Sequence, residues 1–356
     1  MQKIFTILFL TLTLCQKGFA QDDPQQKLTT QYTAAINYVD AAINSITALN
    51  SLIKKENYRN KVASFNNPTS SDMGFNLQLE INTALKPLLE KSRNINQNKF
   101  TDVVGSLVGS NGKSNLLKNL TPATGIFSTL TSLVGSLVVT EKRITTNDLD
   151  SFILNIGKYF GQYEKLNRIN QQFDISIDKI DLRLQELQID LKDYLLDLVV
   201  AYNSTIQRSN LKQKNVEEIF LKYLDKTAID STIENAFNNE KQETNEKREI
   251  NDKRETRNNI FFPSDAIKTA KDITSTIQKI FAEYQKIYTA NYNDIKNILQ
   301  ETKTLGKHIN TQTIDNSLTE LQTLYTESKN ADALNLRLYT LTERLKILVA
   351  TEKIKK

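Results

Sequence analysis

Few side chains in this sequence could carry out acid–base or metal chemistry. Histidine occurs once, at His308, and cysteine occurs once, at Cys15. A lone imidazole beside Gly306 is typical of an exposed turn rather than of a general base. Acidic pairs such as Asp148 and Asp150 are typical of helix starts, and no His, Cys, Asp or Glu group has metal-ligand spacing. We therefore predict no catalytic residue, no metal site, no cofactor and no enzymatic activity.

One segment resembles a phosphate-binding loop. Residues 109–114 read GSNGKS, which matches the end of the pattern G-x-x-x-x-G-K-[ST]. The first glycine of that pattern should stand at position 107, which is occupied by Leu107, and no clear strand precedes the segment. We interpret it as a tight turn between two apolar arms. The net charge of +5, with positive and negative residues interspersed, also predicts no nucleic-acid partner.

The first twenty residues have the pattern of a secretory signal peptide. Lys3 precedes an apolar run over 4–14, and Gly18 and Ala20 are the small residues that a signal peptidase reads. We expect cleavage before Gln21 and export to the periplasm or the medium. Lipidation of Cys15 is not favoured, because Leu14 stands where a lipoprotein signal has a small residue.

The composition of the chain changes over residues 103–140. This stretch carries only two charges, Lys113 and Lys118, although charged residues make up 24% of the chain. Residues 119–140 carry no charge, and five of the ten glycines fall within 103–140. Gly105 and Gly109 form a GxxxG pair of the kind that lets membrane helices pack closely. We predict an apolar helical hairpin, or head, held between long amphipathic helices.

Two interpretations of this hairpin remain open. It is either a buried hairpin of a soluble bundle, or an element that swings into a bilayer or binds a partner. The candidate insertion residues are Val103, Val104, Gly105, Leu107, Val108, Gly109, Ile126, Phe127, Leu130, Leu133, Val134, Leu137 and Val138. The candidate hinges are Gly105, Gly112, Gly125 and Gly135.

Long helices are predicted on both sides of the hairpin. Apolar residues recur every three or four positions from Leu28 to Ile53, which predicts one amphipathic helix. Helix is also predicted for most of 75–100. The most regular heptad pattern is Ile177, Ile180, Leu184, Leu187, Leu191, Tyr194 and Leu198. Such a repeat predicts coiled-coil packing, and a helix unbroken from Asp148 to Leu224 would be about 110 Å long.

The remainder of the chain completes an all-α fold. The highly charged segment 239–259 is predicted to be a solvated helix or connector. Two apolar stripes within 264–356, separated near Gly306, predict further helices. The expected architecture is an elongated bundle of long antiparallel helices. The predicted segments are a signal peptide (1–20), N-terminal helices (21–102), the apolar hairpin (103–140), a long coiled-coil helix with its continuation (141–238), a charged connector (239–263) and C-terminal helices (264–356).

This plan resembles the ClyA-type α-helical pore-forming toxins, which include the haemolysin BL and non-haemolytic enterotoxin components. The resemblance covers the order of export signal, long helices and one uncharged hairpin, and no diagnostic motif. It implies that 103–140 is a membrane-inserting head, with a lipid bilayer or further copies of the chain as partners. The alternative is a structural or binding protein of the periplasm or cell envelope that acts as a helical scaffold for a protein partner.

Overall fold

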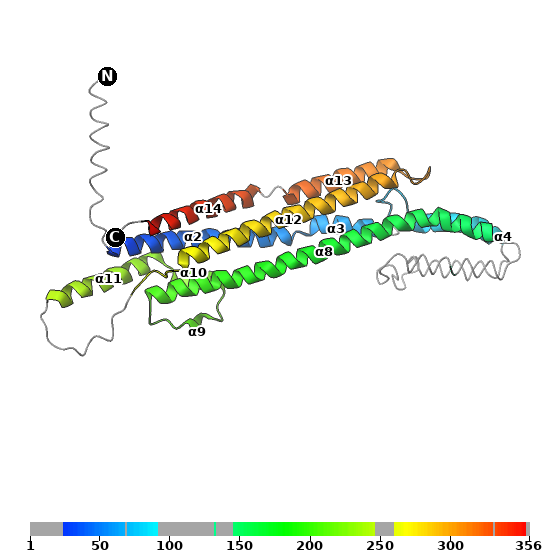
Figure 1. Cartoon of the computed structure of the whole chain (residues 1–356). Helices are drawn as coiled ribbons and strands as arrows, with labels where there is room; N and C mark the ends of the chain where they lie inside the picture. Colours follow the sequence, from blue (N-terminus) through cyan, green and yellow to red (C-terminus); the bar gives the residue numbers. More distant parts are fainter. Residues whose placement is uncertain are drawn as a thin grey trace, which may run out of the picture. The chain divides into compact units, whose positions relative to one another are not determined.

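The structure is a computed structural model that describes residues 24–67, 70–91, 132, 145–245, 260–329 and 332–353. Within these residues the chain is all-α, with no strand, as predicted. Figure 1 shows the helices in chain order. They are α2 (Pro24–Ile53), α3 (Glu56–Phe65), α4 (Leu77–Lys91), α8 (Thr146–Tyr202), α9 (Arg208–Leu211), α10 (Val216–Tyr223), α11 (Lys226–Asn245), α12 (Ala266–Thr302), α13 (Thr311–Lys329) and α14 (Asp332–Glu352).

The contacts divide the chain into two compact units. Unit 1 comprises residues up to Ser51, Leu182–Phe281 and those from Asp332 onward, and unit 2 comprises Leu52–Asp181 and Ala282–Ala331. Helices α2, α8 and α12 each contribute to both units. Each unit has a core of its own, because the apolar stripes of these amphipathic helices need neighbours to remove them from water.

Tyrosines anchor the core of unit 1. The Tyr32 hydroxyl donates to the carbonyl of Phe261 at 2.8 Å, and the Tyr38 hydroxyl donates to the carbonyl of Ala270 at 2.7 Å. The ring of Tyr38 meets that of Tyr194 edge to face, with centroids 5.9 Å apart. Because Tyr32 contacts Tyr202 and Tyr38 contacts Tyr194, α2 and α8 run antiparallel in this unit.

Aromatic rings also fill the core of unit 2. The rings of Tyr58, Phe173 and Tyr288 contact one another, with centroid distances of 5.0 to 5.8 Å. The Tyr58 hydroxyl donates to Asn291 Oδ1 at 2.7 Å. Each buried ring removes a large apolar surface from water, and the two edge-to-face pairs that Phe173 makes add about 0.5–1.5 kcal/mol each.

Unit 2 also buries polar atoms that lack a partner. Asn170 is 8% exposed, and neither atom of its side-chain amide has a hydrogen-bond partner among the described residues. The same holds for Gln162 Oε1 and Asn291 Nδ2. An unpaired buried polar group costs about 1–3 kcal/mol. Unit 2 is therefore less stable than its apolar contacts alone would make it.

A glycine turn connects the break after α3 to α13. Gly74 has a φ of +78°, a conformation that side chains disfavour, and its carbonyl accepts from the backbone N–H of Asn310 at 2.8 Å. A Cβ at this position would lie 2.7 Å from Ile314 Cγ1 and 2.8 Å from the Asn310 oxygen. Only glycine fits without a shift of the backbone.

The predicted seam on α8 is buried, but the helix is shorter than the unbroken Asp148–Leu224 helix that the sequence allowed. All seven residues of the seam from Ile177 to Leu198 are at most 2% exposed. The helix ends at Tyr202 instead of continuing to Leu224. Asn203 ends it, because its side-chain oxygen accepts from the backbone N–H and the hydroxyl of Thr205 and so competes with helical hydrogen bonds. The chain then continues in the short helices α9 and α10.

Candidate functional site

The segment 103–140, which contains every candidate insertion and hinge residue, lies outside the described residues, except that position 132 is helical. The loop-like segment 109–114 lies outside them as well. Of the two helices that flank this region, α4 and the part of α8 up to Asp181 belong to unit 2. The described residues nearest to the segment are Lys91 on one side and Thr145 on the other.

An ion pair joins the two attachment points. Lys91, the last residue of α4, donates from Nζ to Oδ1 of Asp148 in the first turn of α8, at 2.8 Å. Asp148 Oδ2 also accepts from the backbone N–H and the hydroxyl of Thr145, each at 2.9 Å, and caps the start of α8. These hydrogen bonds, that from Lys91 first, lower the pKa of Asp148 to about 2. The end of α4 and the start of α8 therefore lie next to each other in unit 2.

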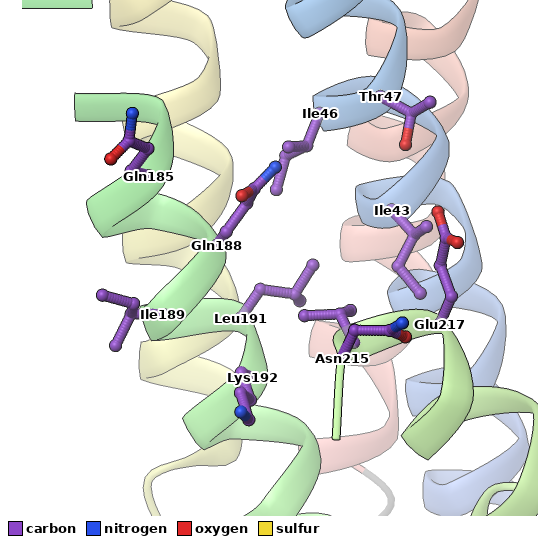
Figure 2. A pocket seen from close by; sticks show the side chains of 11 residues that line it. Ile43, Ile46, Thr47, Gln185, Gln188, Ile189, Leu191, Lys192, Asn215 and Glu217 are labelled. Carbon is purple, nitrogen blue, oxygen red and sulfur yellow. The ribbon is translucent and has the colours of Figure 1, made fainter. Parts of the chain in front are cut away.

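Unit 1 contains a groove between α2 and α8, here called the α2–α8 groove. Its volume is about 490 Å³. The residues that line it are Ile43, Ile46 and Thr47 of α2, Gln185, Gln188, Ile189, Leu191 and Lys192 of α8, and Asn215, Val216 and Glu217 at the start of α10. In Figure 2, Gln188 and Leu191 point from α8 toward α2. Ile46 and Leu191 are 3% and 1% exposed, so the groove is apolar at its base.

The start of α10 closes one end of this groove. The Asn215 side chain accepts from the backbone N–H of Glu218 at 2.8 Å, and the Glu218 side chain accepts from the backbone N–H of Asn215. This capping box fixes where the helix begins. The helix begins near Ile43, where Asn215 and Glu217 line the groove.

The described residues present no constellation for catalysis. His308 is exposed, and no group of three or more His, Cys, Asp and Glu residues among those described could hold a metal ion. Burial raises the pKa of Tyr159 to about 12 and raises the pKa of Tyr58 and Tyr284 further. These hydroxyls stay protonated near neutral pH, so they serve packing and hydrogen bonding.

In the part of the chain that the structure describes, none of the helices is both long and apolar enough to cross a membrane.

Sequence reasoning did not identify the groove. Only Ile189 gives a partial signal for it: this side chain is 60% exposed, lies outside the buried seam of α8 and lines the groove, whereas Leu182, seven residues earlier and 59% exposed, does not line it. Two exposed aliphatic residues at this spacing mark a second apolar strip on the helix. The matching wall on α2 comes from a helix far away in sequence, so the groove itself required the fold.

Comparisons with known proteins identify no relative: no protein-family model, curated protein or solved structure matches this chain.

Proposed function

We propose that this protein is an exported helical bundle that interacts with membranes through residues 103–140, in the manner of the ClyA-type pore formers that it resembles in plan. Export rests on the leader-like residues 1–20. The membrane interaction rests on the uncharged run 119–140, in which a helix could enter a bilayer without burying a charge.

The ion pair at the base of the segment carries this proposal. Lys91 and Asp148 place the two described ends of the intervening chain next to each other, so that the segment could rearrange while α4 and the start of α8 keep their places in unit 2. Such an arrangement suits a head on a helical body. A bilayer would shift the equilibrium of the head toward the inserted state only by the difference in lipid affinity between the inserted and the non-inserted state.

Dye release from lipid vesicles tests the proposal. Vesicles of zwitterionic and anionic phospholipid, loaded with a self-quenching dye, are mixed with the purified chain between pH 5 and 8. Leu130→Asp and Leu137→Asp place charges within the apolar stretch and should abolish release, whereas Leu154→Asp, at a side chain that is 78% exposed, should not. A chain that neither floats with vesicles nor releases dye at any of these pH values would refute the proposal.

A second candidate function is a helical scaffold of the cell envelope that binds a protein partner. The observation that favours it is the α2–α8 groove, whose base is apolar and whose lining also includes Lys192 and Glu217. A photoreactive side chain at Ile189 should then cross-link one defined protein in the native envelope, and the same group at Leu154 should not. Equal cross-linking from both positions would contradict the scaffold function.

A further inference from the structure

Among the described residues, the side-chain amides that are buried all lie in unit 2. They are Gln162, Asn170 and Asn291. Buried hydroxyls such as those of Ser45 and Thr302 donate to backbone carbonyls four residues earlier, at 2.8 and 2.7 Å. The amides lack such partners, because neither amide atom of Asn170 and only one of Asn291 is hydrogen-bonded within the described chain. Unit 2 therefore has polar groups within its core that its own packing leaves unpaired.

Helices α8 and α12 run antiparallel in unit 2. The rings of Phe173 on α8 and Tyr288 on α12 meet edge to face, with centroids 5.0 Å apart. Eight residues earlier on α8, Lys165 pairs at 2.5 Å with Glu301, which lies thirteen residues later on α12. One turn back along α8 is therefore level with one turn forward along α12.

Two of the buried amides lie at one level of unit 2. Asn170 precedes Phe173 by one turn of α8, and Asn291 follows Tyr288 by one turn of α12. Residues three apart share a face of a helix, so both amides lie on the same side of the ring contact. The Tyr58 hydroxyl donates to Asn291 Oδ1 at 2.7 Å, but Asn170 bonds to neither of them. The two amides are level and yet do not pair.

Helix α3 adds a third unpaired group at this level. The Nε atom of Arg59 is buried and has no partner among the described residues. The Cζ atom of the same guanidinium lies 6.0 Å from the centroid of the Phe173 ring. We call Arg59 Nε and the side-chain amides of Asn170 and Asn291 the polar layer of unit 2.

The polar layer interrupts an otherwise apolar stretch of α8. Leu166, about one turn before it, and Ile177, beyond Phe173, are 0% and 2% exposed. The unpaired atoms are buried, so water reaches them only when the helices part, and parting then gives them hydrogen bonds that the packed unit withholds. The seam at Leu184 and Leu187 in unit 1 gains no such bonds on opening and only exposes apolar surface.

We infer that unit 2 opens locally at the polar layer, where α8 parts from α12 and α3, while the seam of unit 1 stays closed. Folded chains open in parts, and the parts that open most easily are those with the least favourable packing. Such an opening lets the helices of unit 2 rearrange without loss of unit 1. It involves unit 2 alone, so it depends neither on membrane interaction nor on a scaffold function.

Native-state hydrogen exchange of the full chain, followed by mass spectrometry of peptic fragments, tests this opening. Backbone N–H groups of α8 over 166–177 should exchange at least about tenfold faster than those over 184–191. Asn170→Leu removes two unpaired polar atoms and should slow exchange over 166–177 at least about fivefold, with no change over 184–191. Gln171→Leu is the matched control, since it makes the same kind of change at the adjacent, exposed position and should leave both segments unchanged.

The wild-type comparison decides the matter even if a variant fails to fold. Equal exchange over 166–177 and 184–191 in the wild-type chain overturns the inference. Unchanged exchange over 166–177 in Asn170→Leu overturns it too, and so does an equal effect of Gln171→Leu. Faster exchange in Asn170→Leu would show that the amide of Asn170 has a hydrogen-bond partner in the closed unit, such as a buried water, and would also overturn it.

Discussion

Replacing Leu187 by Asp tests the packing of α8 most severely. Leu187 is 1% exposed and lies between Leu184 and Leu191, which are equally buried, in unit 1. Removal of a buried leucine side chain costs about 2–5 kcal/mol. Leu187→Asp removes that side chain and also introduces a carboxyl group with no charged partner in an apolar seam.

The cost of the carboxyl group depends on pH. A buried carboxyl without a partner is protonated. At pH 7, protonation of a group whose ordinary pKa is about 3.9 costs about 4 kcal/mol, because each pH unit above the pKa costs about 1.4 kcal/mol. The total of about 6–9 kcal/mol is comparable to the whole stability of an ordinary domain. We expect unit 1 of Leu187→Asp to be largely unfolded at pH 7.

The sign of the pH dependence follows from the raised pKa. The folded-state pKa of the introduced carboxyl lies above its unfolded value, so the penalty is smallest below about pH 4 and grows as the pH rises toward the folded pKa. Far-ultraviolet circular dichroism without denaturant, at pH 4.5 and pH 7, measures how much of the variant is folded at each pH. The variant should regain about 3 kcal/mol relative to wild type at the lower pH.

Ile189→Asp is the matched control. Ile189 lies two residues further along the same helix and is 60% exposed. Its carboxylate stays hydrated, so the free energy of unfolding should change by less than about 1 kcal/mol, with no comparable pH dependence. Equal losses in the two variants, or no loss in Leu187→Asp, would refute the assignment of the buried seam.

Four further variants test details of unit 2. Gly74→Ala should lower the free energy of unfolding by about 2–4 kcal/mol, because of the positive φ and the close approach of the new Cβ. Gly161→Ala should raise it by up to about 1 kcal/mol, because a Cβ there meets nothing within 4 Å. Denaturant unfolding measures both changes. In Asn170→Leu, the leucine side chain resembles asparagine in shape and lacks the two unpaired polar atoms, so the melting temperature should rise. A fall in the melting temperature would show that the amide of Asn170 is hydrogen-bonded. Lys91→Ala should raise the pKa of Asp148 from about 2 toward 3.8, which NMR titration of the carboxyl group would follow. An unchanged pKa would show that Lys91 and Asp148 do not form the ion pair. Because the folded pKa is depressed, the stabilisation from Asp148 is present above about pH 4 and is lost as the pH falls through about 2.

The sequence predicted the all-α fold and the buried seam well, because three- and four-residue spacing fixes which side of a helix is apolar. The end of α8 was not predicted. Asn203 and Thr205 resemble many solvent-facing residues within the chain's helices, and their turn is recognisable only from the side-chain hydrogen bonds that they make. The helix start at Thr145 was predictable, since Thr145 and Asp148 have the spacing of a reciprocal cap.

The surfaces of unit 1 were harder to predict from sequence. The groove joins Ile43 of α2 to Leu191 of α8, and no local pattern relates two positions so far apart. Helix α14 has leucines at Leu334, Leu336 and Leu338, but which of them face solvent depends on the neighbours that the fold supplies. Gly74 was likewise missed, because its positive φ follows from the hydrogen bond to Asn310.

The central functional proposal is that residues 103–140 enter a lipid bilayer while the helical bundle stays outside it. The only cysteine is Cys15, so a Cys15→Ser background permits one environment-sensitive fluorophore at Leu130→Cys and, separately, at Leu154→Cys. When phospholipid vesicles are added, the account predicts a blue shift and protection from an aqueous quencher at position 130, with neither change at position 154. Unchanged emission at position 130, in a chain that remains folded, would contradict it.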